Sequence, residues 1–598
     1  LNRITSSRDV TFPDNEMQFE PLPSAWSAHF YFPQDKLEAV GDEFQQRLPL
    51  QQPARRVTLP VTNAVPGAAP LAPIAAAVPM PAAGGQGADR VLFPADGADL
   101  LFTYRETPFH PVHAFTAKTT AGPIPLPKNE MEALDENNPY HKEWRAAMLL
   151  DCKKKEDNGA TCYADTEETK AKGYRIHGGK WAFAIKYEDD GITPKEFRAR
   201  WVFKGFTEIE GVDYDDTFIG TIVGATQRIM IAEAARRCKV LYECDVRAAF
   251  TTATMDRELY FQCPRPFSPK GKCCKAVKSM EGSKQAGNLY YKEHSTCFTE
   301  KLKLERCKAD PNLYRKITPN GYIYIGVLVD NCLILPSDHK MLNWFLTEYK
   351  KHYTITGGDP VKKFNGVQVE QDTVNGKISI YQPTYIEQVY RKFLNGMTRT
   401  MTAPVEPGEA GAKKFMALEG APKDKPDPLM HDKDYPALIG CLNYISQQSR
   451  PDVTFHVSFL SQFMSNPSIK EYDAALNVLC YLYHTRQLKI TYGGKIRDLP
   501  CQTKPEVSLS SLEANNGLHV GSDASFGSIK SHGGHVVMYM NAAICWVSRR
   551  LKVVAVSSTE AEVAAGVPAA KDIRFVLHIL DFFGVEIKGA VPLLIDNE

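Results

Sequence analysis

Two aspartates follow short apolar runs in the middle of the chain. Asp245 lies in Cys-Asp-Val-Arg-Ala-Ala-Phe (244–250), and Asp330 lies in Gly-Val-Leu-Val-Asp-Asn (326–331). A carboxylate at the end of a buried strand is costly to desolvate unless it binds a cation or a hydrogen-bond donor. We therefore predict that separate strands bring the two carboxylates to one divalent-metal site. Two metal ions about 3.5–4 Å apart stabilise the attacking and leaving oxygens in nucleotidyl transfer.

Phe250 and Asn331 are close to these aspartates, and each allows two interpretations. An aromatic ring five residues after Asp245 could lie beneath the sugar of an incoming nucleotide and exclude a 2′-hydroxyl. Alternatively, Phe250 is a core residue that follows the strand and Asp245 is a cap. An Asp-Asn pair between apolar runs is also typical of a plain hairpin turn. The order of the two motifs favours the catalytic interpretation.

Polar and basic side chains near the two motifs could bind a nucleotide. Arg200 and Lys204 precede the first aspartate on a predicted hairpin, where they could contact a triphosphate whose charge spreads during transfer. A solvated basic strand face is the alternative. Gln285 follows Gly282 in a polar loop and could hydrogen-bond to the template or nucleotide, although an ordinary loop entering a helix has the same composition.

The last 80 or so residues contain an independent set of carboxylates. Asp523 ends an apparent strand, Glu560 begins a helix that Ser557 or Ser558 would cap, and Asp596 follows another strand. Such groups can converge on two magnesium ions for phosphodiester hydrolysis. A helix N-terminus attracts glutamate without any catalysis, and Glu562 competes with Glu560 for the role.

Ordinary strands and helices must position these groups. Apolar and alternating runs predict strands, and apolar residues at helical spacing predict helices. The predicted strands are 180–187, 196–206, 240–246 and the hairpin 321–335. The predicted helices are 141–155, 225–238 and several within 435–487, with a break at 450–452. From about residue 517 the pattern is strand, turn, strand, strand, helix, strand.

Composition narrows the class of protein. The chain has 598 residues, 43% hydrophobic and 24% charged, with a formal net charge of +1, so a surface that binds nucleic acid must be local. Its 14 cysteines contain no Cys-x-x-Cys pair, which argues against zinc knuckles and disulfide scaffolds and favours a reducing intracellular setting. No apolar run approaches the roughly 20 residues that span a bilayer.

Proline, alanine and glycine dominate residues 49–98, and we expect a disordered linker there. Residues 403–430, rich in Pro, Gly, Lys and Asp, predict a second linker. The chain begins with Leu1 and ends with Asp-Asn-Glu (596–598). We therefore expect a fragment of a longer product.

Taken together, the motifs resemble the reverse transcriptase and ribonuclease H region of copia-type LTR retrotransposon polyproteins. The resemblance runs from about residue 130 to the last residue. The segments that carry it are 200–206 (RWVFKGF), 211–218 (GVDYDDTF), 244–250 (CDVRAAF), 259–264 (LYFQCP), 284–286 (KQA), 326–331 (GVLVDN), 435–444 (YPALIGCLNY), 450–452 (RPD) and 557–562 (SSTEAE). No single segment is decisive, but their order and spacing are specific.

The resemblance implies an α+β chain: a right-hand polymerase with fingers, palm and thumb, then a helical connection and an α/β ribonuclease H-like domain. The implied boundaries are a variable or disordered connector at 1–125, the polymerase at 126–400, a linker at 401–430, the connection at 431–510 and a C-terminally truncated nuclease at 511–598.

The resemblance also implies roles. Asp245 and Asp330 would bind Mg²⁺, which Mn²⁺ could replace, and Phe250 would be the sugar gate. Asp523, Glu560 and Asp596 would bind metal in the nuclease. The implied partners are an RNA template, a DNA primer, RNA–DNA hybrid and deoxynucleoside triphosphates, with no membrane. The implied location is a cytoplasmic particle or the nucleus.

Three departures from the family pattern bear on activity. The family's palm turn is tyrosine, any residue, Asp, Asp, whereas this chain has Leu328 and Asn331 at the first and last positions. Asparagine offers one neutral oxygen, so the site lacks a negative charge that would hold metal. Thr251-Thr252-Ala253 replace the usual Leu-Asn-Gly. We therefore expect weak polymerase activity, or an inactive degenerate copy that only binds nucleic acid.

Overall fold

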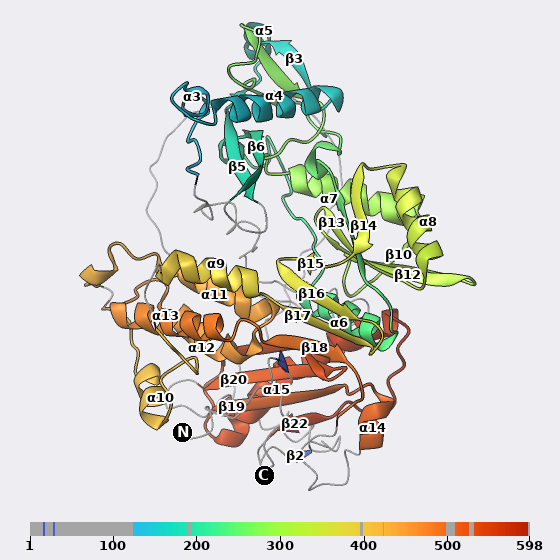
Figure 1. Ribbon diagram of the computed structural model, residues 1–598, viewed down its shortest axis with the longest axis vertical. Coiled ribbons are helices and arrows are strands. Elements are labelled where there is room, and N and C mark those ends of the chain that lie inside the picture. The colour runs from blue at the N-terminus through green and yellow to red at the C-terminus, as the bar shows by residue number, and fades with distance from the viewer. Residues whose placement is uncertain are drawn as a thin grey trace, which may run out of the picture. The chain divides into compact units, whose positions relative to one another are not determined.

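The computed structural model describes residues 16–17, 28–29, 124–187, 193–394, 399–422, 424–497, 509–525 and 531–595. All of them belong to one compact unit. Most of the predicted 1–125 connector and the predicted ligand Asp596 therefore lie outside the described residues. The predicted α+β class is confirmed, since antiparallel sheets are covered by separate helices (Figure 1). No helix in the described ranges is long and apolar enough to cross a membrane.

A six-stranded antiparallel sheet, which we call the central sheet, holds the two aspartate motifs. Its strand order is β10-β11-β12-β13-β7-β14. The strands are β7 (Tyr242–Val246), β10 (Glu305–Arg306), β11 (Leu313–Thr318), β12 (Gly321–Leu328), β13 (Asn331–Pro336) and β14 (Ile355–Pro360). The nearby helices are α6 (Gly224–Arg236), α7 (Ala286–Thr296) and α8 (His339–Lys350). Helix α8 packs against β12, β13 and β14 and buries Phe345 and Tyr349.

A long hairpin, β5 (Gly179–Tyr187) and β6 (Pro194–Phe203), precedes the central sheet in the chain. Alternation gives it one aromatic face, which helix α4 covers (Figure 1). Trp144 of α4 is fully buried there, with its ring edge-on to Phe183 and Phe197 at centroid distances of 5.2 and 4.8 Å. The neighbouring elements are α3 (Glu130–Leu134), α4 (His141–Asp157), α5 (Thr166–Ala171), β3 (Thr161–Asp165), β4 (Ile176–His177), β8 (Tyr260–Phe261) and β9 (Lys272–Ala276).

A five-stranded sheet and a group of helices follow the central sheet. The strands are β1 (Glu16–Met17), β15 (Lys363–Phe364), β16 (Val367–Asp372), β17 (Lys377–Tyr381) and β18 (Lys489–Gly493). The helices are α9 (Pro383–Leu394), α10 (Glu409–Met416), α11 (Tyr435–Gln448), α12 (Thr454–Leu460) and α13 (Ile469–His484). Helix α10 lies within the predicted linker 401–430, and its buried Phe415 ring stands 5.0 Å from that of Phe459. Packing against α12, rather than local composition, orders this segment.

The predicted break at 450–452 has a physical cause. Arg450 is buried, with 1% of its surface exposed, and its guanidinium donates to both carboxylate oxygens of Asp452. The same guanidinium donates to the backbone oxygen and hydroxyl of Thr485 at the end of α13. Pro451 cannot continue helix α11, and the partners of Arg450 hold the chain in its new direction at this point.

The last sheet, which we call the terminal sheet, has the order β2-β22-β19-β20-β21. Its elements are β2 (Ala28–His29), β19 (His519–Ser525), β20 (His532–Tyr539), β21 (Ala542–Arg550) and β22 (Leu593–Ile595), with helices α14 (Leu509–Ala514) and α15 (Ser558–Phe582). Strands β19 and β22 are parallel, and the 25-residue helix α15 packs on β19 and β20. This is the predicted order of strand, turn, strand, strand, helix, strand.

Candidate functional site

Strand register brings the two aspartate motifs together. Asp245 of β7 is the Cα partner of Asn331 on β13, and the backbone N–H of Val246 donates to the carbonyl of Asp330 at 2.9 Å. On its other side Asp245 is paired with Thr356 of β14. The first aspartate therefore lies on a central strand of the sheet, directly beside the hairpin turn that carries the second.

The electrostatics of the pair show that the carboxylates influence each other. Burial raises the pKa of Asp330, and the negative charge of Asp245 raises it further. The pKa of Asp245 is also raised by burial, while the charges of Lys186, Arg247 and Arg198 oppose this rise. Two neighbouring half-buried carboxylates with raised pKa values mark a candidate functional site.

The hairpin turn between β12 and β13 has strained backbone. Leu328 and Asn331 close the turn as Cα partners, so Val329 and Asp330 form its tip. Val329 has φ of +57°, a conformation that a β-branched residue adopts only at an energetic cost. The side-chain amide of Asn331 donates to the Asp330 carboxylate at 3.2 Å. The Asn331 amide thus stabilises the Asp330 carboxylate by a hydrogen bond and adds no negative charge of its own.

The β5–β6 hairpin has a basic face, which we define as Lys186, Arg198 and Arg200. Arg198 and Arg200 are the Cα partners of Ala184 and Ala182, so small side chains leave the guanidinium groups uncovered. Burial raises the pKa of both aspartates. The charges of Lys186 and Arg198 oppose that rise at Asp245, and the charge of Arg200 opposes it at Asp330. Arg198 also forms an ion pair with Glu196 at 2.9 Å. The basic face therefore acts electrostatically on both aspartates.

The other three predicted nucleotide-binding residues, Lys204, Phe250 and Gln285, lie outside the basic face. Lys204 follows β6, half-buried, and its backbone N–H donates to Gly178. Phe250 lies in the 3₁₀ helix η3 (Ala249–Thr251), half-buried, with its ring edge-on to Tyr290 at 6.2 Å. Gln285 is 2% exposed, and its amide donates to Asp256 at 2.7 Å. The Gln285 side chain thus forms an internal hydrogen bond within the protein.

The terminal sheet brings Asp523 near a glutamate of α15, but that glutamate is Glu562. Glu562 is 4% exposed, and its carboxylate accepts the backbone N–H of Ala524, the residue after Asp523, at 3.1 Å. Glu560 instead accepts the backbone N–H of Val556 at 2.7 Å, while Ser557 caps the helix. Of the two glutamates left open by the sequence, the structure thus places Glu562 beside the Asp523 segment and uses the Glu560 carboxylate at the helix N-terminus, and the catalytic role of either stays a prediction.

Two further groups were missed by reasoning from the sequence. Glu243 lies two residues before Asp245 on β7, and its pKa is raised by burial and then by the charges of Asp245 and Asp359. Strand alternation from Asp245 could have indicated it. Lys186 could have been found from the hairpin register, which places it on the same face as Arg198.

Comparison with known proteins gives a consistent result. Residues 168–407 match the family model "Reverse transcriptase (RNA-dependent DNA polymerase)". The chain is 25% identical over 468 residues to the retrovirus-related Pol polyprotein from transposon TNT 1-94 of Nicotiana tabacum, covering 77% of this chain and 33% of that protein. It is 25% identical over 430 residues to the Pol polyprotein from transposon RE1 of Arabidopsis thaliana, covering 71% and 27%. This chain thus spans a third or less of these polyproteins.

A shorter relative is matched over nearly its whole length. It is the putative transposon Ty5-1 protein of Saccharomyces cerevisiae, 30% identical over 329 residues, with 53% of this chain and 96% of that protein covered. Among solved structures, the foamy viral protease-reverse transcriptase in complex with double-stranded DNA is matched at a TM-score of 0.38 and 10% identity, over 72% of this chain and 61% of that one. The sequence matches and the motifs point to the same family. The chain belongs to the reverse transcriptase family of copia-type retrotransposon polyproteins.

Proposed function

We propose that this chain is an RNA-directed DNA polymerase whose central sheet is the palm, with a ribonuclease H activity in the terminal sheet. The observation that carries the polymerase proposal is the β7–β13 register, which puts Asp245 beside the turn that holds Asp330. Primer extension on an RNA template with Mg²⁺ or Mn²⁺ tests it. Product that depends on Asp245 supports the proposal.

The donor set fits a hard divalent cation. Asp245 and Asp330 offer carboxylate oxygens, and Asn331 offers a neutral amide oxygen. Mg²⁺ binds such oxygen ligands together with substrate phosphates. Burial and then the negative charge of Asp245 raise the pKa of Asp330, and a bound ion would offset both effects. When bound, the ion would activate the primer hydroxyl and stabilise charge on the phosphate oxygens.

In the proposed reaction, the 3′-oxygen of the primer forms a bond to the α-phosphorus of a deoxynucleoside triphosphate. The bond from the α-phosphorus to the bridging oxygen breaks, pyrophosphate leaves, and the hydroxyl proton passes to solvent. Arg198 and Arg200 would pair with the triphosphate, because guanidinium groups donate two parallel hydrogen bonds to phosphate oxygens. Phe250 would contact the deoxyribose. RNA template, DNA primer and hybrid duplex would be the macromolecular partners.

A second candidate function is nucleic-acid binding without synthesis, and Asn331 favours it. The amide removes one negative charge from the metal site and donates to Asp330. In that case the basic face would still contact phosphates, and hybrid binding would weaken steeply as salt rises. Hybrid binding with no primer extension in either metal ion would support this candidate.

The charge of Asp330 leads to a prediction about stability. Because folding raises the pKa of this buried carboxyl, the ionised form destabilises the metal-free protein, and this loss of stability develops as pH rises through the raised pKa. We expect Asp330→Asn, without divalent ions at neutral pH, to melt at the parent temperature or slightly above it, since the shift in melting temperature for a given change in stability shrinks as the folded unit grows. Calorimetry with and without Mg²⁺ measures it, and the ion should stabilise the parent more than the variant.

Asp372 is the matched control for this stability prediction. It is an aspartate in another hairpin turn that accepts hydrogen bonds from an asparagine, here Asn375. Its pKa is lowered by the Asn375 side chain and backbone, so ionisation favours the fold and Asp372→Asn should lower the melting temperature or leave it unchanged. A clear fall in melting temperature for Asp330→Asn without metal would contradict the proposed metal site.

Arg200 should contribute to triphosphate binding. A hydrogen bond between a guanidinium and a phosphate contributes about 1.5–3 kcal/mol, so Arg200→Ala should lower kcat/KM for the deoxynucleotide about 10- to 100-fold. Steady-state extension at varied nucleotide concentration measures this. Lys170→Ala is the control. It removes an exposed charge on α5 that is paired with Glu167, and because exposed ion pairs contribute little, kcat/KM should change less than about twofold. Equal losses in the two variants would exclude a specific role for Arg200.

A further inference from the structure

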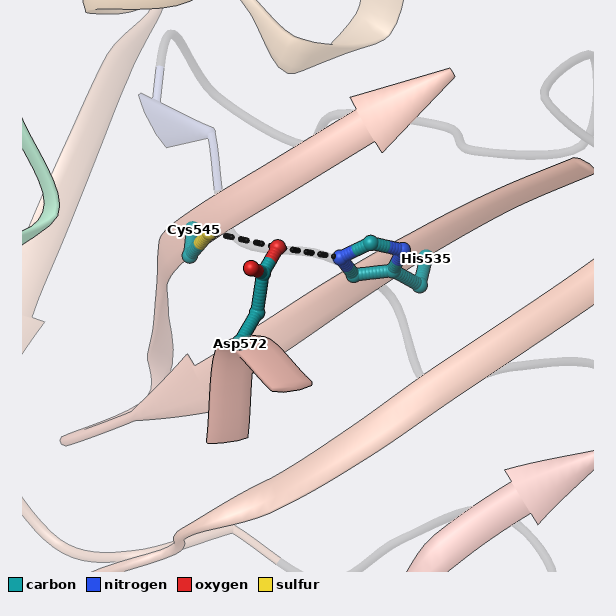
Figure 2. A group of neighbouring side chains, drawn as sticks. All are labelled: His535, Cys545 and Asp572. Atoms are coloured by element: carbon teal, nitrogen blue, oxygen red, sulfur yellow. Dashed lines mark hydrogen bonds and ion pairs between the residues drawn. The ribbon is translucent and has the colours of Figure 1, made fainter. Parts of the chain in front are cut away.

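A buried polar cluster lies on the terminal sheet, and the proposed polymerase and nuclease functions do not use it. It consists of His535 on β20, Cys545 on β21 and Asp572 on α15, and Figure 2 shows the three side chains pointing toward one another. His535 and Cys545 are 7% and 8% exposed. Three separate elements therefore each direct one metal-ligating side chain to one point.

The position of Asp572 on its helix is unusual for a carboxylate. The face of α15 that packs on the sheet buries Ala565, Ala569, Val576 and Ile579. Asp572 lies three residues after Ala569 and four before Val576, in the same stripe, where an apolar side chain would ordinarily pack. A carboxylate at such a position requires partners that offset its desolvation. The sheet supplies an imidazole and a thiol.

The distances within the cluster suit coordination. His535 Nε2 lies 2.7 Å and Cys545 Sγ lies 3.5 Å from the same oxygen, Asp572 Oδ2, and all three ligand atoms lie within 4.8 Å of one another. In a tetrahedral zinc site with bonds of 2.0–2.3 Å, neighbouring ligand atoms are roughly 3.3–3.7 Å apart. Shifts of about 1 Å, within the reach of rotamer adjustment, would therefore admit an ion.

We propose that His535, Cys545 and Asp572 bind one Zn²⁺ ion, with a water molecule as the fourth ligand. A nitrogen, a sulfur and an oxygen donor form a set that suits zinc and does not suit Mg²⁺. The Asp572 side chain, 18% exposed, provides the side of the cluster from which water and the ion enter. The ion would join β20, β21 and α15, and so would hold the helix that carries Glu562 on its sheet.

Protonation makes this site dependent on pH and on the metal. In the metal-free protein, burial and then the charge of Asp572 raise the pKa of the Cys545 thiol, so the thiol keeps its proton. Zinc binding would release that proton to solvent and use the deprotonated Nε2 of His535. Arg228 opposes the thiol's rise in pKa, and its guanidinium donates to the carbonyls of Ile544 and Gln447. This cation favours the thiolate.

The experiment is a titration of untagged full-length chain with Co²⁺, which reports thiolate ligation by a charge-transfer absorption band. The protein is first treated with a chelator and then kept in excess Mg²⁺ so that carboxylate sites do not take up the probe. We expect one equivalent of Co²⁺ to give the band and Zn²⁺ to displace it. Cys545→Ser should abolish the band, and Asp572→Asn should weaken Co²⁺ and Zn²⁺ binding at least about tenfold.

Cys480→Ser is the matched control, because Cys480 is also buried but lies on α13 in a different core cluster. It should leave the band unchanged, and circular dichroism checks that each variant folds. If Cys545→Ser fails to fold, Asp572→Asn decides, since asparagine can still accept from His535. The proposal is overturned if the folded parent gives no band, if the band persists in Cys545→Ser, or if Asp572→Asn binds Co²⁺ with the affinity of the parent. Neither result depends on polymerase activity.

Discussion

Asn331→Asp should raise primer extension on an RNA template by about 10²–10³-fold with Mg²⁺, on the scale of losing or gaining one electrostatic group in an active site. The substitution replaces a neutral amide that donates to Asp330 with a carboxylate that faces Asp245 across the β7–β13 pair. A third negative charge would strengthen the hold on the metal and on the charge that develops at the phosphate. Rates of single-nucleotide addition measure the effect.

The same substitution should weaken the protein when metal is absent. Like charges directly opposite each other in a sheet destabilise it, and the pKa of Asp245 is already raised by burial. We therefore expect Asn331→Asp to melt below the parent in chelator and to recover in Mg²⁺. This opposite behaviour in stability and activity would connect the gain in rate to ion binding rather than to better folding.

Two variants make the gain in rate specific. Asn320→Asp adds the same charge at the exposed β11–β12 turn of the same sheet and should leave extension unchanged. Adding Asp245→Asn to the Asn331→Asp variant should remove the gained activity. If Asn331→Asp folds and binds Mg²⁺ but extends no primer, the polymerase proposal is wrong for this chain, and binding without synthesis is the better account.

The sequence predicted the central sheet well because its signals are local. Apolar runs of strand length flank Asp245 and Asp330, and the predicted strand 240–246 and hairpin 321–335 are observed as β7 and as β12 with β13. The pairing of β7 with β13 could be expected only from the family resemblance, since the two strands are far apart in the chain. Burial is the main cause of the raised pKa of Asp330, and only the smaller contribution from the charge of Asp245 depends on that pairing.

Side-chain direction was harder to predict than strand position. For Gln285 the sequence allowed either a hydrogen bond to the template or nucleotide or an ordinary loop entering a helix; the residue lies at the start of α7 with its amide bonded to Asp256, 29 residues away in sequence. Helix α10 was expected to be part of a linker, yet Phe415 packs into a core that forms only in three dimensions. In both cases a long-range contact outweighs the local composition that the prediction used.

Glu562→Gln should lower cleavage of the RNA strand in an RNA–DNA hybrid by about 10²–10³-fold, whereas Glu560→Gln should leave it within a few-fold of the parent. Both residues begin α15, but two residues turn a helix by roughly 200°, so they face opposite sides. Glu562 lies in the buried stripe and accepts the N–H of the residue after Asp523. Gel assays of hybrid cleavage in Mg²⁺ measure the two variants against the parent.

The free energy of unfolding should respond in the opposite way to the activity: Glu560→Gln should lower it, and Glu562→Gln should leave it nearly unchanged. Glu560→Gln keeps an oxygen that can accept the N–H of Val556 but removes a negative charge from the helix N-terminus, so it should weaken the helix start by about 0.3–1 kcal/mol. Glutamine at position 562 keeps an oxygen that can accept from Ala524, so that variant should fold normally. Activity lost through Glu560→Gln alone would restore the first interpretation of the site. If the folded parent cleaves no hybrid, the nuclease proposal fails. The contact between Glu562 and the Asp523 segment would then contribute only to packing.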